Sequence, residues 1–161
     1  MSNEYHFITQ WRFEGTVVAD VYEAIGNPLG YTRWWPTVYL DVQELEQGDA
    51  NGIGRRFRFH TKGWLPYKLR WESRVTEIER PNRLVIRATG DFDGRGIWTL
   101  QQQGGAVAVE FDWKLSAEKP LIRYLSFLFK PLFSANHRWA MALGEKGLAQ
   151  ELVRRAPRKT A

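Results

Sequence analysis

The 161-residue chain contains no cysteine, which excludes disulfide bonds, thiolate metal sites, iron–sulfur clusters and cysteine nucleophiles. It also has no run of about 20 apolar residues that could cross a membrane. Its richest apolar stretch, residues 121–133, is interrupted by Arg123, Lys130 and Pro131. Residues 1–16 lack the apolar core of a signal peptide. The sequence therefore predicts a soluble, cytoplasmic protein.

The motifs of common metal, hydrolase and nucleotide sites are absent as well. The three histidines, His6, His60 and His137, show neither HxH nor HxxxH spacing, so we expect no metal site. No GxSxG motif marks a nucleophilic serine. The Gly-Arg-Gly at residues 94–96 lacks the third glycine of a dinucleotide-binding loop. We expect no cofactor.

The excess of positive charge is concentrated near the end of the chain. The sequence has 23 basic and 18 acidic side chains. Four basic residues and no acidic residue fall within residues 154–161, and the remainder is balanced at 19 to 18. We expect a single domain over residues 1–153 and a basic tail over residues 154–161. Such a tail can contact nucleic acid or an anionic membrane, but a solvated helix end is the simpler interpretation.

Aromatic side chains are abundant, at 14% of the residues, and many of them recur at every second position. In residues 4–13, Tyr5, Phe7, Trp11 and Phe13 alternate with polar side chains, which is typical of a strand with one buried face. Seven segments show this alternation, namely residues 4–13, 38–42, 56–61, 67–75, 84–92, 96–100 and 107–115.

Turn signals between these segments predict an antiparallel sheet. The Asp-Gly pair at 93–94 and the Gly-Gly pair at 104–105 are typical of hairpins. In the segment 38–42, alternation places Val38 and Leu40 on one face and Tyr39 on the other. The charged face of the sheet carries both signs, as a solvated face does.

Three parts of the chain have helical signals. Residues 16–26 predict a short helix with Thr16 as its N-cap, and residues 28–34 predict a second one. Residues 120–155 share a helical period in which Pro131 predicts a kink or a break.

Two glycines inside this last helix, Gly144 and Gly147, each cost about 1 kcal/mol relative to alanine. They predict a close approach of the helix to the sheet. No other large element remains to cover the apolar face of the sheet. The sequence therefore predicts an α+β fold, with a seven-stranded antiparallel sheet wrapped around a long C-terminal helix and two short helices after the first strand.

This arrangement resembles the helix-grip fold of the SRPBCC superfamily, which includes START and birch-pollen-allergen-like proteins. The local sequence resembles its bacterial polyketide cyclase/dehydrase branch over about residues 4–153. The residues that carry the likeness are Trp34-Trp35-Pro36, residues 90–98, Phe111-Asp112-Trp113, residues 136–141, Gly144, Gly147 and Leu148. The resemblance implies a ligand cavity between the sheet and the long helix. It does not define one function, because the superfamily includes lipid and hormone binders, cyclases and chaperone adaptors.

The inward aromatic side chains either fill the core or line such a cavity. Small-molecule pockets are mostly apolar and aromatic, with a few polar groups that fix orientation. We expect the ligand to be bound by residues of the inward sheet face and of the helices, namely Trp35, Phe59, Tyr67, Leu69, Trp71, Trp98, Trp113, Asn136, His137 and Met141.

Asn136 and His137 are polar residues among apolar ones in the long helix. A buried polar pair must be hydrogen-bonded, so it either holds the helix onto its neighbours or serves a ligand. In the second case His137 is a ligand donor or a general acid or base. Tyr67 is then its expected partner across the cavity, with Tyr5 behind it.

Three functions follow from these features. The first is a binding protein for a hydrophobic small molecule, either lipid or polyketide-like. The alternative is a cofactor-independent cyclase or dehydratase that uses His137 and Tyr67 as catalytic residues. The third is a lipid carrier or adaptor with weak membrane-surface contact through residues 64–65 and 121–133. We expect no nucleic-acid binding, because alternation separates the aromatic side chains from the arginines.

A ligand in a closed cavity needs a segment that opens. Residues 63–66 form a loop with an apolar tip, and Pro131 divides the last helix. We expect residues 62–66 and 120–131 to be more mobile than the strands.

Overall fold

The computed structural model describes residues 4–65, 67–117 and 120–156, with the backbone alone for residues 117 and 121–129. Most of the predicted basic tail, residues 157–161, lies outside the described residues, and so does Pro66 of the expected mobile loop. The mobility of residues 62–66 and 120–131 stays a prediction.

Within the described residues, seven strands and four helical segments follow one another. In chain order they are β1 (Glu4–Glu14), α1 (Val18–Gly26), η1 (Pro28–Gly30), α2 (Tyr31–Trp34), β2 (Tyr39–Glu46), β3 (Arg56–Lys62), β4 (Lys68–Glu79), β5 (Arg83–Gly90), β6 (Phe92–Gln103), β7 (Ala106–Ala117) and α3 (Pro120–Arg155).

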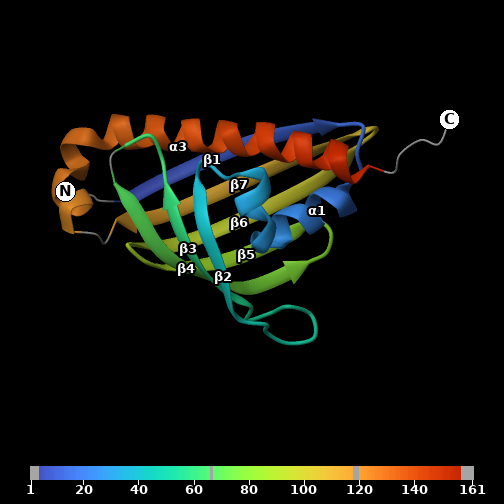
Figure 1. Ribbon diagram of the computed structural model, residues 1–161, viewed down its shortest axis with the longest axis horizontal. Helices are drawn as coiled ribbons and strands as arrows, with labels where there is room; N and C mark the ends of the chain where they lie inside the picture. The colour runs from blue at the N-terminus through green and yellow to red at the C-terminus, as the bar shows by residue number, and fades with distance from the viewer. Residues whose placement is uncertain (1–3, 66, 118–119, 157–161) are drawn as a thin grey trace.

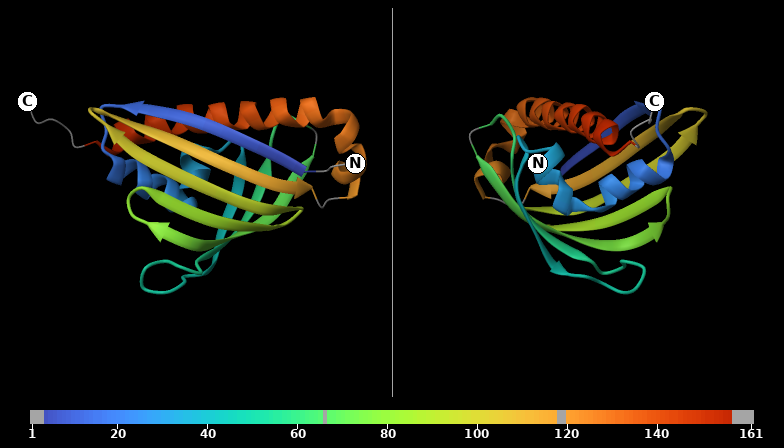
Figure 2. Two further views of the ribbon diagram at one scale, coloured as in Figure 1. Left: turned by 180° about the vertical axis from the view of Figure 1, so that it is seen from behind. Right: turned by 45° about the vertical axis from the view of Figure 1, so that its right-hand side comes forward.

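The strands form a single sheet in the order β1-β7-β6-β5-β4-β3-β2, and every neighbouring pair is antiparallel. The sheet is strongly curved, and α3 lies along its open side (Figure 1). Seen from the side, the sheet wraps partly around α3, with α1 and α2 closing one end (Figure 2). This arrangement confirms the predicted helix-grip α+β fold.

Alternating burial confirms most of the predicted inward face. In β1, Tyr5, Trp11 and Phe13 are buried, whereas the residues between them are exposed or half-buried. The exception is β2, where the register with β3 shifts between Tyr39 and Asp41. Such a bulge reverses the faces of the residues that follow it. The expectation was therefore wrong for two residues, since Leu40 is 37% exposed and Tyr39 faces the interior, whereas Val38 is buried as expected.

The first helix begins without the predicted cap. α1 starts at Val18, and neither Val17 nor Thr16 makes a side-chain capping bond. Instead, Gln102 in β6 accepts a hydrogen bond from the Val18 amide at 2.8 Å and donates one to the Thr16 carbonyl at 3.3 Å. A side chain distant in sequence thus satisfies one of the free amides of the helix N-terminus.

The long helix α3 contains Pro131, and its first turns bend sharply away from the rest (Figures 1 and 2). This is the predicted kink. No helix in the described part of the chain is long and apolar enough to span a membrane.

The two glycines of α3 do allow a close approach, but mainly to the α2 segment. A Cβ on Gly147 would lie 1.8 Å from the Trp34 carbonyl oxygen, and one on Gly144 would lie 2.5 Å from the Trp35 ring. From the sheet, only Trp11 of β1 comes near, at 2.9 Å from the Gly144 position. The predicted partner, the sheet, is therefore only part of the contact.

A buried acid fixes the far end of α3 to α2. Glu151 is 3% exposed and accepts hydrogen bonds from Arg33 at 2.7 Å, Arg154 at 2.8 Å and Arg155 at 3.0 Å. These bonds, above all that from Arg33, lower the pKa of Glu151 to about 2. Arg154 and Arg155 therefore belong to α3 and hold Glu151 as an ion.

Candidate functional site

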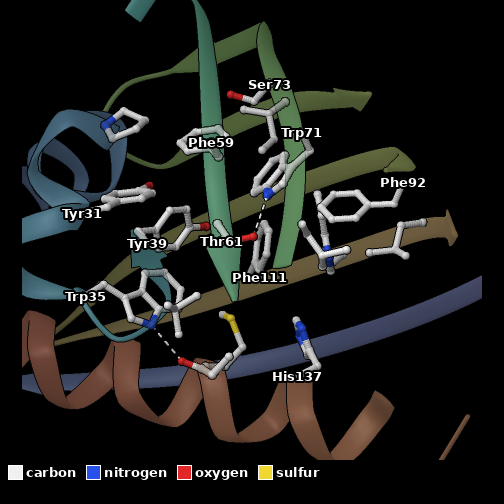
Figure 3. A pocket seen from close by; sticks show the side chains of 18 of the residues that line it. Tyr31, Trp35, Tyr39, Phe59, Thr61, Trp71, Ser73, Phe92, Phe111 and His137 are labelled. Atoms are coloured by element: carbon white, nitrogen blue, oxygen red, sulfur yellow. Dashed lines mark hydrogen bonds between the residues drawn. The ribbon is translucent and has the colours of Figure 1, made fainter. Parts of the chain in front are cut away.

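A cavity of about 190 Å³ lies between the concave face of the sheet and α3. Alternation in each strand directs one set of side chains into this space, and α2 and α3 close it. Figure 3 shows the aromatic side chains that point into it from several strands and from α2. The aromatic lining residues are Tyr5, Phe7, Tyr31, Trp35, Tyr39, Phe57, Phe59, Tyr67, Trp71, Phe92, Trp98, Phe111, Trp113 and Phe133.

Neighbouring rings in the wall contact one another directly. The Trp98 and Phe111 rings are stacked, with centroids 4.0 Å apart. The ring of Trp71 lies 4.4 Å from Phe59 and 4.9 Å from Phe92. Large flat rings on a curved sheet leave gaps between them, and the cavity is such a gap.

The ten residues that the sequence predicts as ligand-binding all line this cavity, namely Trp35, Phe59, Tyr67, Leu69, Trp71, Trp98, Trp113, Asn136, His137 and Met141. The structure brings them together, but their binding of a ligand stays a prediction.

Sequence reasoning missed two tyrosines of the wall. Tyr39 was assigned to the wrong face because the bulge in β2 is not visible in the alternation pattern. Tyr31 lies in a helix too short to show a periodic pattern. Its hydroxyl donates a hydrogen bond to the Ile25 carbonyl, which fixes the ring against α1.

Asn136 anchors the connection between β3 and β4. Its side-chain oxygen accepts hydrogen bonds from the backbone amides of Trp64 at 2.8 Å and Leu65 at 3.4 Å. A Cβ on Gly63 would lie 2.0 Å from that same oxygen, so only glycine allows this approach. Figure 1 shows the β3–β4 connection reaching across to α3. Asn136 therefore positions a wall of the cavity.

His137 presents a polar atom to the cavity. Its ring stacks on Phe7, with centroids 4.1 Å apart, and points into the cavity from α3 (Figure 3). Its Nε2 atom is buried and has no hydrogen-bond partner among the described residues. Burial, and secondarily the positive charge of Arg138, lower the His137 pKa to about 4. The imidazole is therefore neutral at pH 7.

Tyr67 lies on the sheet side of the cavity, next to the β3–β4 connection. Burial, and secondarily Tyr5, raise its pKa to about 12, so its hydroxyl stays protonated. The ring of Phe133 lies between the two tyrosines, 6.0 Å from Tyr67 and 6.1 Å from Tyr5. In the described part of the chain, no hydrogen bond joins Tyr67 to His137.

Two indoles of the wall are bonded within the protein. The indole of Trp71 donates to the Thr61 hydroxyl at 3.1 Å, and that of Trp35 donates to the Ala140 carbonyl at 2.9 Å. Both bonds appear as dashed lines in Figure 3. No group of three or more potential metal ligands occurs among the residues that the structure describes. The imidazole nitrogen Nε2 of His137, by contrast, is a wall atom that a ligand can bond.

The sequence family can now be identified. A model of the family described as Activator of Hsp90 ATPase homolog 1-like protein matches residues 16–130. The chain belongs to this family. No curated protein matches the chain significantly.

Solved structures with this fold cover nearly the whole chain of this family member. The protein TTHA0849 from Thermus thermophilus matches at 17% identity and a TM-score of 0.80, covering 95% of this chain and 100% of that one. The Zhui aromatase/cyclase from Streptomyces sp. R1128 matches at 16% identity and a TM-score of 0.70, covering 98% and 99%. A START superfamily protein from Mycobacterium smegmatis matches at 11% identity and a TM-score of 0.68, covering 94% and 99%. At these identities the structures show that the fold is shared.

Proposed function

We propose that this protein binds a small hydrophobic molecule, with an aromatic part, in the cavity between the sheet and α3. The observation that carries the proposal is the aromatic-walled cavity of about 190 Å³ with the unsatisfied Nε2 atom of His137 in its wall. An empty space of this kind costs packing energy unless a guest fills it.

The volume of the cavity limits the guest. An apolar cavity of about 150 Å³ in another protein binds benzene, so about 190 Å³ suits one or two fused rings. A long acyl chain or an extended polyketide would have to displace side chains of the wall. We therefore favour a compact aromatic guest over a lipid.

The polar groups of the wall suit a guest with one oxygen substituent. A neutral imidazole donates or accepts a hydrogen bond, and a protonated phenol does both. His137 and Tyr67 carry these groups on opposite walls. The aromatase/cyclase among the structural neighbours supports the choice of an aromatic guest.

A cyclase or dehydratase that uses His137 and Tyr67 as catalytic residues is the second candidate. Two of the neighbours are named as di-domain aromatase/cyclases, StfQ and BexL. However, a general acid or base works best with a pKa near the working pH, whereas the pKa values are about 4 for His137 and about 12 for Tyr67. These values favour binding over acid–base chemistry. If the protein is an enzyme, the wild type should convert a bound guest, whereas His137→Gln should bind the same guest and leave it unchanged. Mass spectrometry of the guest recovered from each protein distinguishes an enzyme from a binding protein.

Membrane docking is a third candidate, because two large apolar side chains near the β3–β4 end are exposed. Trp64 is 46% exposed and Leu132 is 44% exposed. If the protein docks on membranes, it should cosediment with anionic vesicles, and this cosedimentation should weaken as salt is added.

Filling the cavity tests the proposal directly. Met141 lines the cavity from α3 and is buried, so Met141→Trp should occupy the space of the guest, and Met141→Leu should conserve its volume. We expect saturable quenching of tryptophan fluorescence by 2-naphthol in the wild type and in Met141→Leu. Met141→Trp should bind at least about tenfold more weakly. If the wild type shows no saturable response to 2-naphthol, naphthalene or indole, the rings form a core and the proposal fails.

A further inference from the structure

A second, open hollow of about 840 Å³ adjoins the cavity at the β3–β4 end. Lys62, Gly63 and Tyr67 line both hollows. The second hollow begins where the wall of the first one ends, beside the connection that Asn136 holds. We refer to it as the basic groove.

The basic groove is lined by positively charged side chains. Lys62, Lys68 and Arg70 line it together with His60, and none of its described lining residues is acidic. Lys62 and Arg70 are exposed and make no ion pair among the described residues. Asp91, on the same sheet, accepts a hydrogen bond from the Arg70 amide at 2.8 Å.

Elsewhere on the outer face of the sheet, several arginines are neutralised by acids. Arg56 and Arg58 both pair with Glu72, at 2.9 Å and 3.1 Å, and Arg87 pairs with Asp93. A solvated face on which opposite charges pair with each other does not require a bound ligand. The groove departs from that pattern, since its described lining carries basic side chains and no acidic one.

The titration of His60 reports the sign of the potential in the groove. Its pKa is lowered by burial first, and then by Arg70 and Lys68, whereas Asp41 acts weakly in the opposite direction. The cations thus outweigh the one acid that His60 senses.

Two indoles complete the groove. Trp64 from the β3–β4 connection and Trp139 from α3 both line it. Indole rings beside positively charged side chains suit a ligand in which an apolar part is joined directly to an anionic group.

We propose that the ligand of the cavity is an amphiphile whose carboxylate or phosphate binds in the basic groove, while its aromatic part occupies the cavity. This inference rests on the proposed function and adds the charge of the ligand to it. Tyr67 lies at the boundary, where the apolar part of the ligand meets its anionic end.

Matched probes test the charge requirement. The probes are 4-(naphthalen-2-yl)butanoate, its uncharged primary amide and the corresponding butyl phosphate, and the dissociation constants are measured by calorimetry. The anions should bind the wild type about tenfold more tightly than the amide, and the difference should shrink at high salt. The preferred anion distinguishes a carboxylate ligand from a phosphate ligand.

Matched variants locate the effect. Lys62→Gln combined with Arg70→Gln should abolish the preference for anions, and the affinity for the amide should change by much less than the affinity for the anions. The control combines Arg74→Gln with Lys146→Gln, two exposed residues outside the groove, and should keep the preference. Equal affinities of the anions and the amide in the wild type would overturn this inference alone. Failure of all three probes to bind would overturn the proposed function. If the groove variant keeps the preference for anions but loses binding to vesicles containing phosphatidylglycerol, the groove is a membrane contact instead.

Discussion

His137 stacks on Phe7, and its Nε2 atom is buried without a hydrogen-bond partner among the described residues. Leaving such an atom unsatisfied costs free energy, so the position is explained if a guest completes the bond. The other polar member of the α3 pair, Asn136, is fully accounted for by its bonds to the β3–β4 connection.

Replacing the imidazole with an apolar ring separates the hydrogen bond that His137 makes to a guest from the effect of its shape. We expect His137→Phe to bind 2-naphthol about five- to tenfold more weakly than the wild type does, because one hydrogen bond is lost. Binding of naphthalene should be unchanged, and the free energy of unfolding should stay the same or rise. Calorimetry with both compounds provides the measurement. An equal loss for both compounds would mean that His137 acts through its shape.

At the scale of secondary-structure elements, the sequence predicts the strands best. Alternation succeeds in β1, β3, β4 and β6 because each of these strands has one buried face. It fails in β2, where one bulge moves Tyr39 inward, and at the start of α1, where Gln102 from β6 replaces the predicted cap. Both failures come from partners that are distant in sequence, so no local pattern contains them.

The cavity shows the same limit. Alternation identifies which residues face inward, including Phe59, Trp71 and Trp98. It cannot give the space that they leave, because that space depends on how the side chains of seven strands and α3 pack together. The contact of Gly147 with Trp34 could not be predicted either, because α2 approaches α3 only in the folded chain.

The contact between α2 and α3 predicts a large effect at Gly147. In an open helix Gly→Ala would stabilise by about 1 kcal/mol, but here the new Cβ would overlap the Trp34 carbonyl. We expect Gly147→Ala to lower the free energy of unfolding by about 1–3 kcal/mol, measured by urea denaturation. Gly105→Ala, which meets nothing within 4 Å, is the control and should be nearly neutral. A stabilised Gly147→Ala variant would contradict this packing.

The bond between Asn136 and the β3–β4 connection predicts the kinetics of access. Asn136→Ala removes the acceptor of the Trp64 and Leu65 amides, so the connection should open more often. We expect faster amide exchange at residues 62–65 and faster release of 2-naphthol in stopped flow. Asn82→Ala, at a turn between β4 and β5, is the control. Unchanged release would place the route to the cavity elsewhere.

At the scale of the whole molecule, two ionisable groups with lowered pKa values make the fold sensitive to acid. The pKa of His137 is lowered from 6.5 to about 4, and that of Glu151 from 4.5 to about 2. In both cases the unfolded chain binds protons at a higher pH than the folded one, so stability falls as the pH falls. We expect the loss due to His137 between about pH 6.5 and 4, and that due to Glu151 between about pH 4.5 and 2.

Urea denaturation at a series of pH values measures these losses. His137→Phe should remove the first decline, and Glu151→Gln should remove the second while lowering stability near pH 7 by about 1–3 kcal/mol. Identical pH profiles in the wild type and both variants would show that neither group governs acid sensitivity.

The pairing of β1 with β7 also has a consequence for folding during synthesis of the chain. Strand β1 precedes the other described strands in the chain, lies at one edge of the described sheet and pairs there with β7, from Glu4 beside Ser116 to Glu14 beside Ala106. The apolar side chains of Trp11 and Phe13 therefore lack this strand partner until β7 has been synthesised. Contacts between such distant segments slow folding, and an unpaired apolar strand can associate with other chains. A chain that stops before β7 would keep this strand permanently without its partner.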